Sequence, residues 1–392
     1  MESRPVPDRV VYLDNHATTR VDPRVVEAMQ PYWTEKYGNA ASVSHAFGHE
    51  AADAVETARA QIAELLNATP RNLIFTSGAT EANNLAIKGV VQAAEREGVG
   101  SVHLIVNEAE HRAVLDPARR LKRLGCELTV LAVDEYGMVD PQKLAAAIQP
   151  NTALVSVIFA NNEVGTINPV AEIGEICRER GVLFHCDAAQ AVGKLPVDLA
   201  DLPIDLLSLS AHKMYGPMGV GALYVRGGEK RIPIEPLFDG GGHERRLRSG
   251  TLPVPLIVGF GEACKLAAEG MCDESKRIQQ LRDRLWSGLS QSVEGVHVNG
   301  HPDLRLTGNL NVNFDSVDGD ALMVSLKDIA VSSGSACTSA DPQPSHVLRA
   351  MGVSDELTRA SLRFGLGRFT TLEEIEFAVT YVADAIDRLR RL

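Results

Sequence analysis

The chain is poor in aromatic side chains, which make up 5% of its 392 residues, and its 39 basic residues are outnumbered by 51 acidic ones, for a net charge of −12. This charge argues against nucleic acid or an anionic membrane surface as a direct partner. No apolar stretch approaches the length that spans a bilayer. The first residues, Met1–Pro7, lack the apolar run of a secretory signal and the Arg-rich, acid-free character of a transit peptide, so we expect a cytoplasmic protein.

Cysteine is scarce as well, and none of the six thiols forms a C-x-x-C pair. A chain of this size needs no disulfide to fold, which fits a reducing compartment. Cys126, Cys177 and Cys264 lie in helix-like or strand-like segments, and we predict that they fill the core. Cys337 differs because it lies among small, mostly polar residues in Val331–Ala340, a segment that can barely pack and is expected to be mobile. That thiol is either an accident of surface composition or a nucleophile.

The order of apolar runs predicts an α/β fold. Between about residues 50 and 260, short apolar runs alternate with amphipathic helical patterns, which is typical of an open, largely parallel sheet covered on both faces. The runs that we interpret as buried strands are Leu73–Phe75, Val102–Val106, Ala153–Ile158, Val182–Cys186, Asp205–Leu209 and Gly221–Val225.

The remaining sequence predicts a second, smaller α+β domain. It contains a helical tract from Ile257 to about Val293 with a break near Gly270, two strand-like segments, and a final helix that begins at Thr370-Thr371 in a capping-box pattern. We assign residues 17–259 to the large domain, and residues 1–16 and 260–392, with the Cys337 segment, to the small one.

The polar residues that follow two of the predicted strands indicate a phosphate site and a catalytic lysine. Small and hydroxyl residues in Thr76–Glu81 stand where a helix begins, and free N–H groups there suit an anion. The alternative is an ordinary helix cap. Lys213 stands where a buried strand meets a glycine-rich turn, and its alternative is a surface lysine. Ligands gather at this edge of an open α/β sheet.

Asp187, with Gln190 three residues later, ends the strand before that lysine. Pyridoxal phosphate needs a lysine for its Schiff base, an acid for its pyridinium nitrogen and a phosphate site, and all three are present. A carboxylate about 4 Å from the ring charge is worth roughly 4 kcal/mol at an effective dielectric constant near 20, or about three pK units. His111 also follows a strand and suits ring stacking or proton transfer, or else it is satisfied by the backbone.

With these residues in place, the chain resembles the cysteine desulfurases, the class V branch of the fold-type-I pyridoxal-phosphate aminotransferases. The resemblance runs from Tyr12 to Thr371, and Ser332–Ser339 is similar to the long mobile loop of the housekeeping subgroup that supplies iron–sulfur assembly. The other matching segments are Phe75–Glu81, Glu110-His111, Asn161–Gly165, Asp187–Gln190, Ser210–Lys213 and Gly240–Thr251. His16 stands where such proteins usually have asparagine or serine.

The resemblance implies a role for each matching residue. Lys213 would bind the cofactor and move the substrate's α-proton, and Cys337 would accept the sulfur, with His111 as the stacking and catalytic histidine. Asn162 and Arg363 would bind the substrate carboxylate. The implied cofactor-binding residues are Ala79, Thr80, Asp187, Gln190, Ser210, His212, Lys213 and, toward the phosphate of a second subunit, Thr251. Among them, the resemblance implies that Gln190 contacts the ring hydroxyl of the cofactor.

The expected function is that of a homodimeric cysteine desulfurase that converts L-cysteine to L-alanine and forms a persulfide on Cys337. The sulfur would supply an iron–sulfur scaffold or another acceptor protein, with tRNA thiolation as a further destination. We expect no resident metal, and Cys337 would be at most a transient iron–sulfur ligand. One alternative is a selenocysteine lyase or another class V lyase or aminotransferase, and a second is a non-catalytic sulfur-relay or assembly partner.

Overall fold

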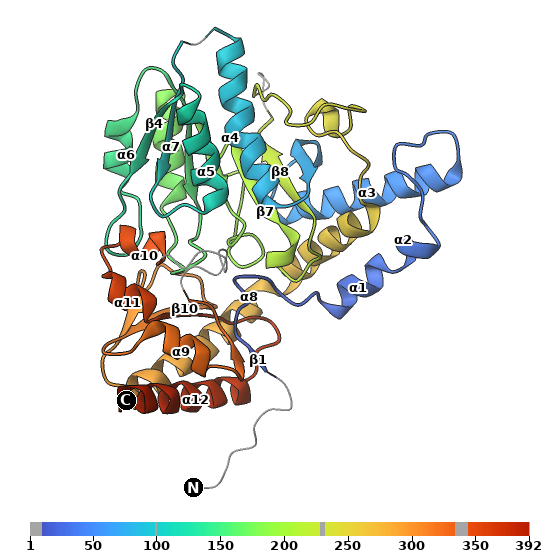
Figure 1. Ribbon diagram of the computed structural model, residues 1–392. Helices are drawn as coiled ribbons and strands as arrows, with labels where there is room; N and C mark the ends of the chain where they lie inside the picture. The colour runs from blue at the N-terminus through green and yellow to red at the C-terminus, as the bar shows by residue number, and fades with distance from the viewer. Residues whose placement is uncertain (1–9, 99, 228–231, 334–343, 392) are drawn as a thin grey trace.

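The computed structural model describes residues 10–98, 100–227, 232–333 and 344–391. Its centre is a seven-stranded sheet with the order β2-β8-β7-β6-β5-β3-β4, in which only β8 runs antiparallel to its neighbours (Figure 1). The strands are β2 (Leu73–Thr76), β3 (His103–Asn107), β4 (Glu127–Leu131), β5 (Thr152–Ile158), β6 (Leu183–Asp187), β7 (Leu206–Ser210) and β8 (Gly221–Val225). The predicted α/β class and its mostly parallel sheet are confirmed.

Both faces of this sheet are buried, because successive side chains of a strand point to opposite sides. Phe75 joins the apolar cluster under α3, α7 and α8, whereas its neighbour Ile74 joins the cluster under α4 and α5. The helices around the sheet are α3 (Ala46–Leu65), α4 (Ala79–Arg96), α5 (Arg112–Arg123), α6 (Pro141–Ala147), α7 (Val170–Arg180) and the first half of α8 (Val254–Ser292). Cys126, Cys177 and Cys264 are buried in these clusters, as predicted.

A second core lies below the first in Figure 1. It is built on the antiparallel sheet β12-β10-β9 and on the short parallel pair β1 and β11, and it includes the second half of α8. The strands and helices of this part are β1 (Val11–Tyr12), β9 (Val296–Asn299), β10 (Asn309–Phe314), α9 (Gly319–Ser325), β11 (Ile329–Ala330), α11 (Asp355–Arg359), β12 (Ser361–Gly365) and α12 (Leu372–Arg390). The short helix α10 (His346–Ala350) packs instead in a separate small cluster with Ala109 and Val164. The predicted capping box at the start of α12 is confirmed, with Thr371 and Glu374 as its two residues.

The break predicted near Gly270 is wrong, because α8 runs without interruption for 39 residues. A glycine costs a helix only about 1 kcal/mol relative to alanine. The helical turns on both sides of Gly270 are buried. Cys264 and Ala267 pack in the large core, and Ile278 and Leu281 pack in the small one. Packing at both ends therefore outweighs the glycine. The same helix also crosses the position between residues 259 and 260, so the predicted domain division there stays a prediction.

The segment between the sheet and α8 is fixed by a buried ion pair. Glu244 accepts two hydrogen bonds from Arg59 on α3, at 2.8 and 2.9 Å, and one from the backbone N–H of Phe75 at 2.7 Å. Residues 244–246 have φ angles of 44°, 58° and 68°, which cost an L-residue roughly 1–2 kcal/mol each. We infer that the ion pair holds this left-handed turn in place.

No helix in the described part of the chain is both long and apolar enough to cross a bilayer. Two further helices, α1 (Pro23–Met29) and α2 (Pro31–Thr34), precede α3. Together with the start of α3 they project from the body of the molecule (Figure 1).

Replacing Glu244 with alanine removes the buried counter-ion of Arg59 and leaves only the exposed Glu56 beside its Nε, so we expect the free energy of unfolding to fall by about 3–5 kcal/mol. Urea unfolding measures this loss. The paired variant Arg59→Met/Glu244→Leu should lose less, because no charge is left buried. Glu376→Ala, which breaks an exposed pair with Arg284, is the control and should cost at most about 1 kcal/mol. Equal losses for Glu244→Ala and Glu376→Ala would contradict the role of the buried pair.

Candidate active site

A cavity of about 410 Å³ lies at the carboxyl ends of the parallel strands, where such folds bind ligands. It brings together residues from β6, β7, the first turn of α4 and the small sheet. The predicted site residues that line it are Ala79, Thr80, His111, Asn162, Asp187, Gln190, Ser210, His212, Lys213 and Arg363. Thr251 is exposed and is not among the lining residues, and Cys337 lies outside the described residues.

The start of α4 provides an anion site on one wall of the cavity. Its N-cap is Gly78, with φ of 151°, and a side chain placed there would meet nothing within 4 Å. The backbone therefore lies open to the cavity, and the first N–H groups of a helix have no acceptor within the helix itself. Across from it Ser210 is 4% exposed, and its Oγ has no hydrogen-bond partner among the described residues. An orphaned buried hydroxyl at this position fits a phosphate oxygen.

Asp187 ends β6 and is 4% exposed. Its Oδ2 accepts a hydrogen bond from Asn83 Nδ2 at 2.7 Å, and its Oδ1 accepts one from the backbone N–H of Ala189 at 3.0 Å. These bonds fix the carboxylate at the bottom of the cavity without placing a cation against it, so it remains available to a protonated ring nitrogen. Asn83, on the buried face of α4, was not found from the sequence, since an asparagine in a helix gives no distinctive signal.

Lys213 is held by backbone carbonyls from the far N-terminal part of the chain. It ends the short turn Ala211–Lys213 that follows β7, and its Nζ donates to the carbonyls of His16 and Ala17 at 2.6 and 2.7 Å. The neighbouring His212 contacts Thr18 Oγ1 at 3.1 Å. Burial, followed by the charges of Lys213 and Lys194, lowers the pKa of His212 to about 4. His212 is therefore neutral at pH 7 and can accept or donate one hydrogen bond at a phosphate.

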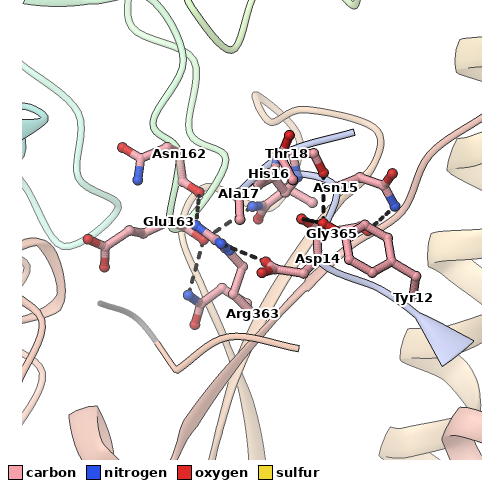
Figure 2. Close-up of polar contacts among 12 residues, drawn as sticks. Tyr12, Asp14, Asn15, His16, Ala17, Thr18, Asn162, Glu163, Arg363 and Gly365 are labelled. Atoms are coloured by element: carbon pink, nitrogen blue, oxygen red, sulfur yellow. Dashed lines mark hydrogen bonds and ion pairs between the residues drawn. The ribbon is translucent and has the colours of Figure 1, made fainter. Parts of the chain in front are cut away.

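Arg363, on β12, is 1% exposed and forms the opposite wall. Its guanidinium lies between the Asp14 carboxylate, at 2.7 Å, and the backbone carbonyl of Asn162, at 2.9 Å (Figure 2). Its Nε is buried without a hydrogen-bond partner among the described residues. The ion pair with Asp14, which the sequence alone did not indicate, orients a cation at a position suited to a small carboxylate.

His111 is the N-cap of α5, and its Nδ1 accepts a hydrogen bond from the backbone N–H of Ala113 at 3.0 Å. The proton of a neutral His111 ring therefore resides on Nε2. The ring lines the cavity on the same side as Thr80 and Ala113. The sequence left open whether His111 is a functional ring or is satisfied by the backbone. In the structure it caps a helix through the backbone and also lines the cavity.

Two buried glutamates beside these residues were also missed from the sequence. Burial raises the pKa of Glu163 to about 7, although a hydrogen bond from Ser345 Oγ opposes the shift. Burial and the charge of Asp187 raise the pKa of Glu110 well above its usual range. Both lie in segments that match the family, Glu110-His111 and Asn161–Gly165, but neither was assigned a role, because their burial results from packing between segments that are distant in sequence.

The chain belongs to the class-V aminotransferase family, whose sequence profile matches residues 11–377. Within that family its relatives are cysteine desulfurases, among them "Cysteine desulfurase IscS" of Anaeromyxobacter dehalogenans strain 2CP-C, which is 53% identical over 382 residues, 97% of this chain and 94% of the relative. Two solved structures are similar. One is a NifS-like protein, with a TM-score of 0.89, 38% identity and coverage of 97% of this chain and 100% of the other. The second is described as SspA in complex with cysteine, with a TM-score of 0.81, 37% identity and coverage of 92% and 100%.

This membership confirms a pyridoxal-phosphate-dependent enzyme of fold type I. The residues of the cavity fit that cofactor. The orphaned Ser210 Oγ and the open start of α4 suit its phosphate, the Asp187 carboxylate suits its ring nitrogen, and Lys213 supplies the amine that its aldehyde requires.

The raised pKa of Glu163 predicts a pH-dependent stability. Protonated Glu163 favours the folded state, so its contribution is complete below its usual pKa near 4.5 and is lost as the pH rises through about 7. We expect Glu163→Gln to gain stability relative to the wild type by up to about 1.4 kcal/mol per pH unit within that window.

The urea midpoints of the two proteins measure this difference when they are determined from pH 5 to pH 8 in steps of about one pH unit. Ser345→Ala, which removes the hydrogen bond that lowers this pKa, should shift the window to higher pH. A difference between Glu163→Gln and the wild type that stays constant with pH would show that Glu163 does not titrate in this range.

Proposed function

We propose that this cysteine desulfurase converts L-cysteine to L-alanine and transfers the sulfur to Cys337 as a persulfide. The single observation that supports this most strongly is the convergence of Lys213, Asp187, Ser210 and Arg363 on one cavity in a chain 53% identical to a cysteine desulfurase. The structure described as SspA with bound cysteine further supports a small amino acid as the ligand of such a site.

The chain's own residues would prepare the reaction. Bound pyridoxal phosphate supplies an electron sink for the negative charge that develops on the substrate's α-carbon. Asp187 would keep the ring nitrogen protonated so that the sink remains effective, and Lys213 Nζ would remove the α-proton and return it. Ala79 and Thr80, at the start of α4, and Ser210 and His212, at the end of β7 and in the turn after it, would hold the phosphate.

Arg363 and Asn162 would bind the substrate carboxylate. Arg363 is already oriented by Asp14, and its Nε is an unused donor among the described residues. Burial strengthens such a charge-assisted bond because little water competes for it.

Cys337 would be the sulfur acceptor, and the described residues near it in sequence support its access to the cavity. Ser332 is paired with Arg363 by two backbone hydrogen bonds, at 2.7 and 3.3 Å, and Ser345 Oγ is bonded to Glu163. In the reaction the Cys337 thiolate attacks the substrate sulfur, an S–S bond forms and the carbon–sulfur bond breaks. The bonding electrons stay on carbon, which takes up a proton and becomes the methyl group of alanine.

We propose that the persulfide then leaves to an iron–sulfur scaffold or to another sulfur-acceptor protein in the cytoplasm, with tRNA thiolation as a further use. This follows the resemblance of the Cys337 segment to that of the housekeeping subgroup. The small, mostly polar residues around Cys337 in the sequence suit such a relay, because the sulfur has to pass to a second protein.

We also propose a homodimer. Large apolar side chains are exposed on the projecting part of the molecule formed by α1, α2 and the start of α3 (Figure 1). They include Trp33, Tyr37, Val43 and Phe47, exposed by 55, 67, 82 and 49%. Contiguous exposed apolar surface of this kind is typical of an interface. Thr251, which does not line its own cavity, would reach the phosphate of the second subunit.

Placing charge on this apolar projection should separate the subunits. Sedimentation is expected to give a dimer for the wild type and a monomer for Tyr37→Glu/Val43→Glu. Val324→Glu is a matched control, because Val324 is 70% exposed on α9, in the other core. A monomeric wild type, or a double variant that remains dimeric, would overturn the assignment of this interface.

Two single substitutions test the reaction itself. Cys337→Ser should bind the cofactor and retain its visible absorption band but form neither persulfide nor alanine in repeated turnovers. Lys213→Ala should lose that band because no amine remains to hold the cofactor. Alanine release and the absorption spectrum are measured on both variants with cysteine, with selenocysteine, and with another amino acid plus a keto acid. Catalytic alanine release by Cys337→Ser would refute the nucleophile assignment.

A further inference from the structure

Lys194 is a second lysine beside the cavity, and the reaction proposed above does not use it. Its Nζ donates a hydrogen bond to Gln190 Oε1 at 2.7 Å. The chain is turned back to make this contact by Gly193, which has φ of 76°, and a side chain at Gly193 would come within 2.6 Å of Met214 Cε. The position of Lys194 is therefore built into the turn that follows β6.

The contacts of Gln190 leave its side-chain amide a single orientation. A protonated lysine has only donors, so the group facing a charged Lys194 must be the amide oxygen. The carbonyl of His16 has only an acceptor, so the group at 2.8 Å from it must be Nε2. Nε2 carries two hydrogens, and one is used by His16. Since Gln190 is 3% exposed and lines the cavity, the second N–H is the group that it offers to a ligand there.

His16 contributes less than Lys194 to this orientation. Its Nδ1 lies 3.1 Å from Gln190 Oε1, and its Nε2 lies 3.3 Å from the carbonyl of Gly308. Burial, followed by the charge of Lys194, lowers the pKa of His16 well below its usual range, so the ring is neutral and has one N–H for two oxygens. The bond from Lys194 is free of this competition.

Neighbouring charges both lower and raise the pKa of Lys194, but its hydrogen bond to Gln190 does not depend on its charge. Burial, followed by the positive charges of Lys213 and Arg363, lowers its pKa to about 7, and Glu274 opposes that shift. His16 and His212, which also face it, are both neutral at pH 7. A neutral amine retains two N–H donors, so Lys194 can donate to Gln190 on either side of its own titration.

We propose that Lys194 is a positioning residue that fixes the Gln190 amide with its N–H, a donor, directed at the ring oxygen of the cofactor. The proposal deepens the function above and rests on it, since it takes Gln190 as the residue that contacts this oxygen. A donor there stabilises negative charge on the ring oxygen. The proton shared between that oxygen and the Lys213 nitrogen is then lost at a lower pH than it would be without the donor.

The pH midpoint of the visible band of the holoenzyme measures this effect without reference to activity. We expect Lys194→Met and Lys194→Ala to raise the midpoint by about one unit, the shift that follows from losing one hydrogen bond to a charged oxygen. Lys194→Arg retains donors and should keep the midpoint near that of the wild type. Lys265→Met, at an exposed lysine paired with Glu262 on α8, should leave it unchanged.

A second pair of variants separates positioning from a direct charge effect on Lys213. If Lys194 acts through Gln190, Lys194→Met should cause no further shift in a Gln190→Ala background. The same shift in both backgrounds, or an unchanged midpoint in Lys194→Met and Lys194→Ala, would overturn the proposal alone. A wild-type protein that gives no visible band with pyridoxal phosphate would instead overturn the proposed function, and this inference with it.

Discussion

The active site depends on the hydrogen bonds that Lys213 Nζ makes to the carbonyls of His16 and Ala17. These carbonyls belong to the segment Asp14–Thr19, which crosses from the small sheet to the carboxyl ends of the large one. At its start the segment is bonded to Gly365 of β12, and at its end Thr19 is bonded to the carbonyl of His212. One short stretch of chain thus fixes the two cores relative to each other and aims the lysine. The boundary that we predicted between residues 16 and 17 falls inside this stretch.

The same segment explains why so much positive charge is tolerated around one cavity. Lys213, Lys194 and Arg363 lie close enough that the first and third each lower the pKa of the second. Backbone carbonyls and the Gln190 amide accept hydrogen bonds from the two lysines, and the Asp14 carboxylate pairs with Arg363, whose Nε is left without a partner among the described residues. Such a cavity favours anions, and an amino-acid substrate and a phosphorylated cofactor each bring one. The cost of burying the cations is then offset when both anions bind, which couples the stability of the site to its occupancy.

Much of the large sheet could be predicted because its strands are buried on both faces and are therefore continuous apolar runs. The edge strand β4 was missed, since most of its residues are at least partly exposed and it has no such run. The residues at the strand ends could also be predicted, because Asp187, Ser210 and Lys213 directly follow apolar runs. The break near Gly270 was predicted wrongly because local propensity was weighed without the two cores that α8 joins. Local signals in the sequence thus predicted the strands and the polar residues at their ends better than they predicted the continuity of a helix that joins the two cores.

Contacts between distant segments could not be predicted, and in this protein they determine how each group is oriented. Arg363 needs Asp14, 349 residues away, and Lys213 needs carbonyls almost 200 residues away. Lys194 is different, because it lies only four residues from Gln190. The sequence did not indicate it, since it belongs to none of the motifs that pointed to the cofactor. Arg363 is also bonded along its backbone to Ser332, so the residue proposed to hold the substrate carboxylate is attached to the chain five residues before Cys337. In the proposed reaction the Arg363 side chain would hold the substrate, while its backbone holds Ser332, so a shift of β12 would displace both together.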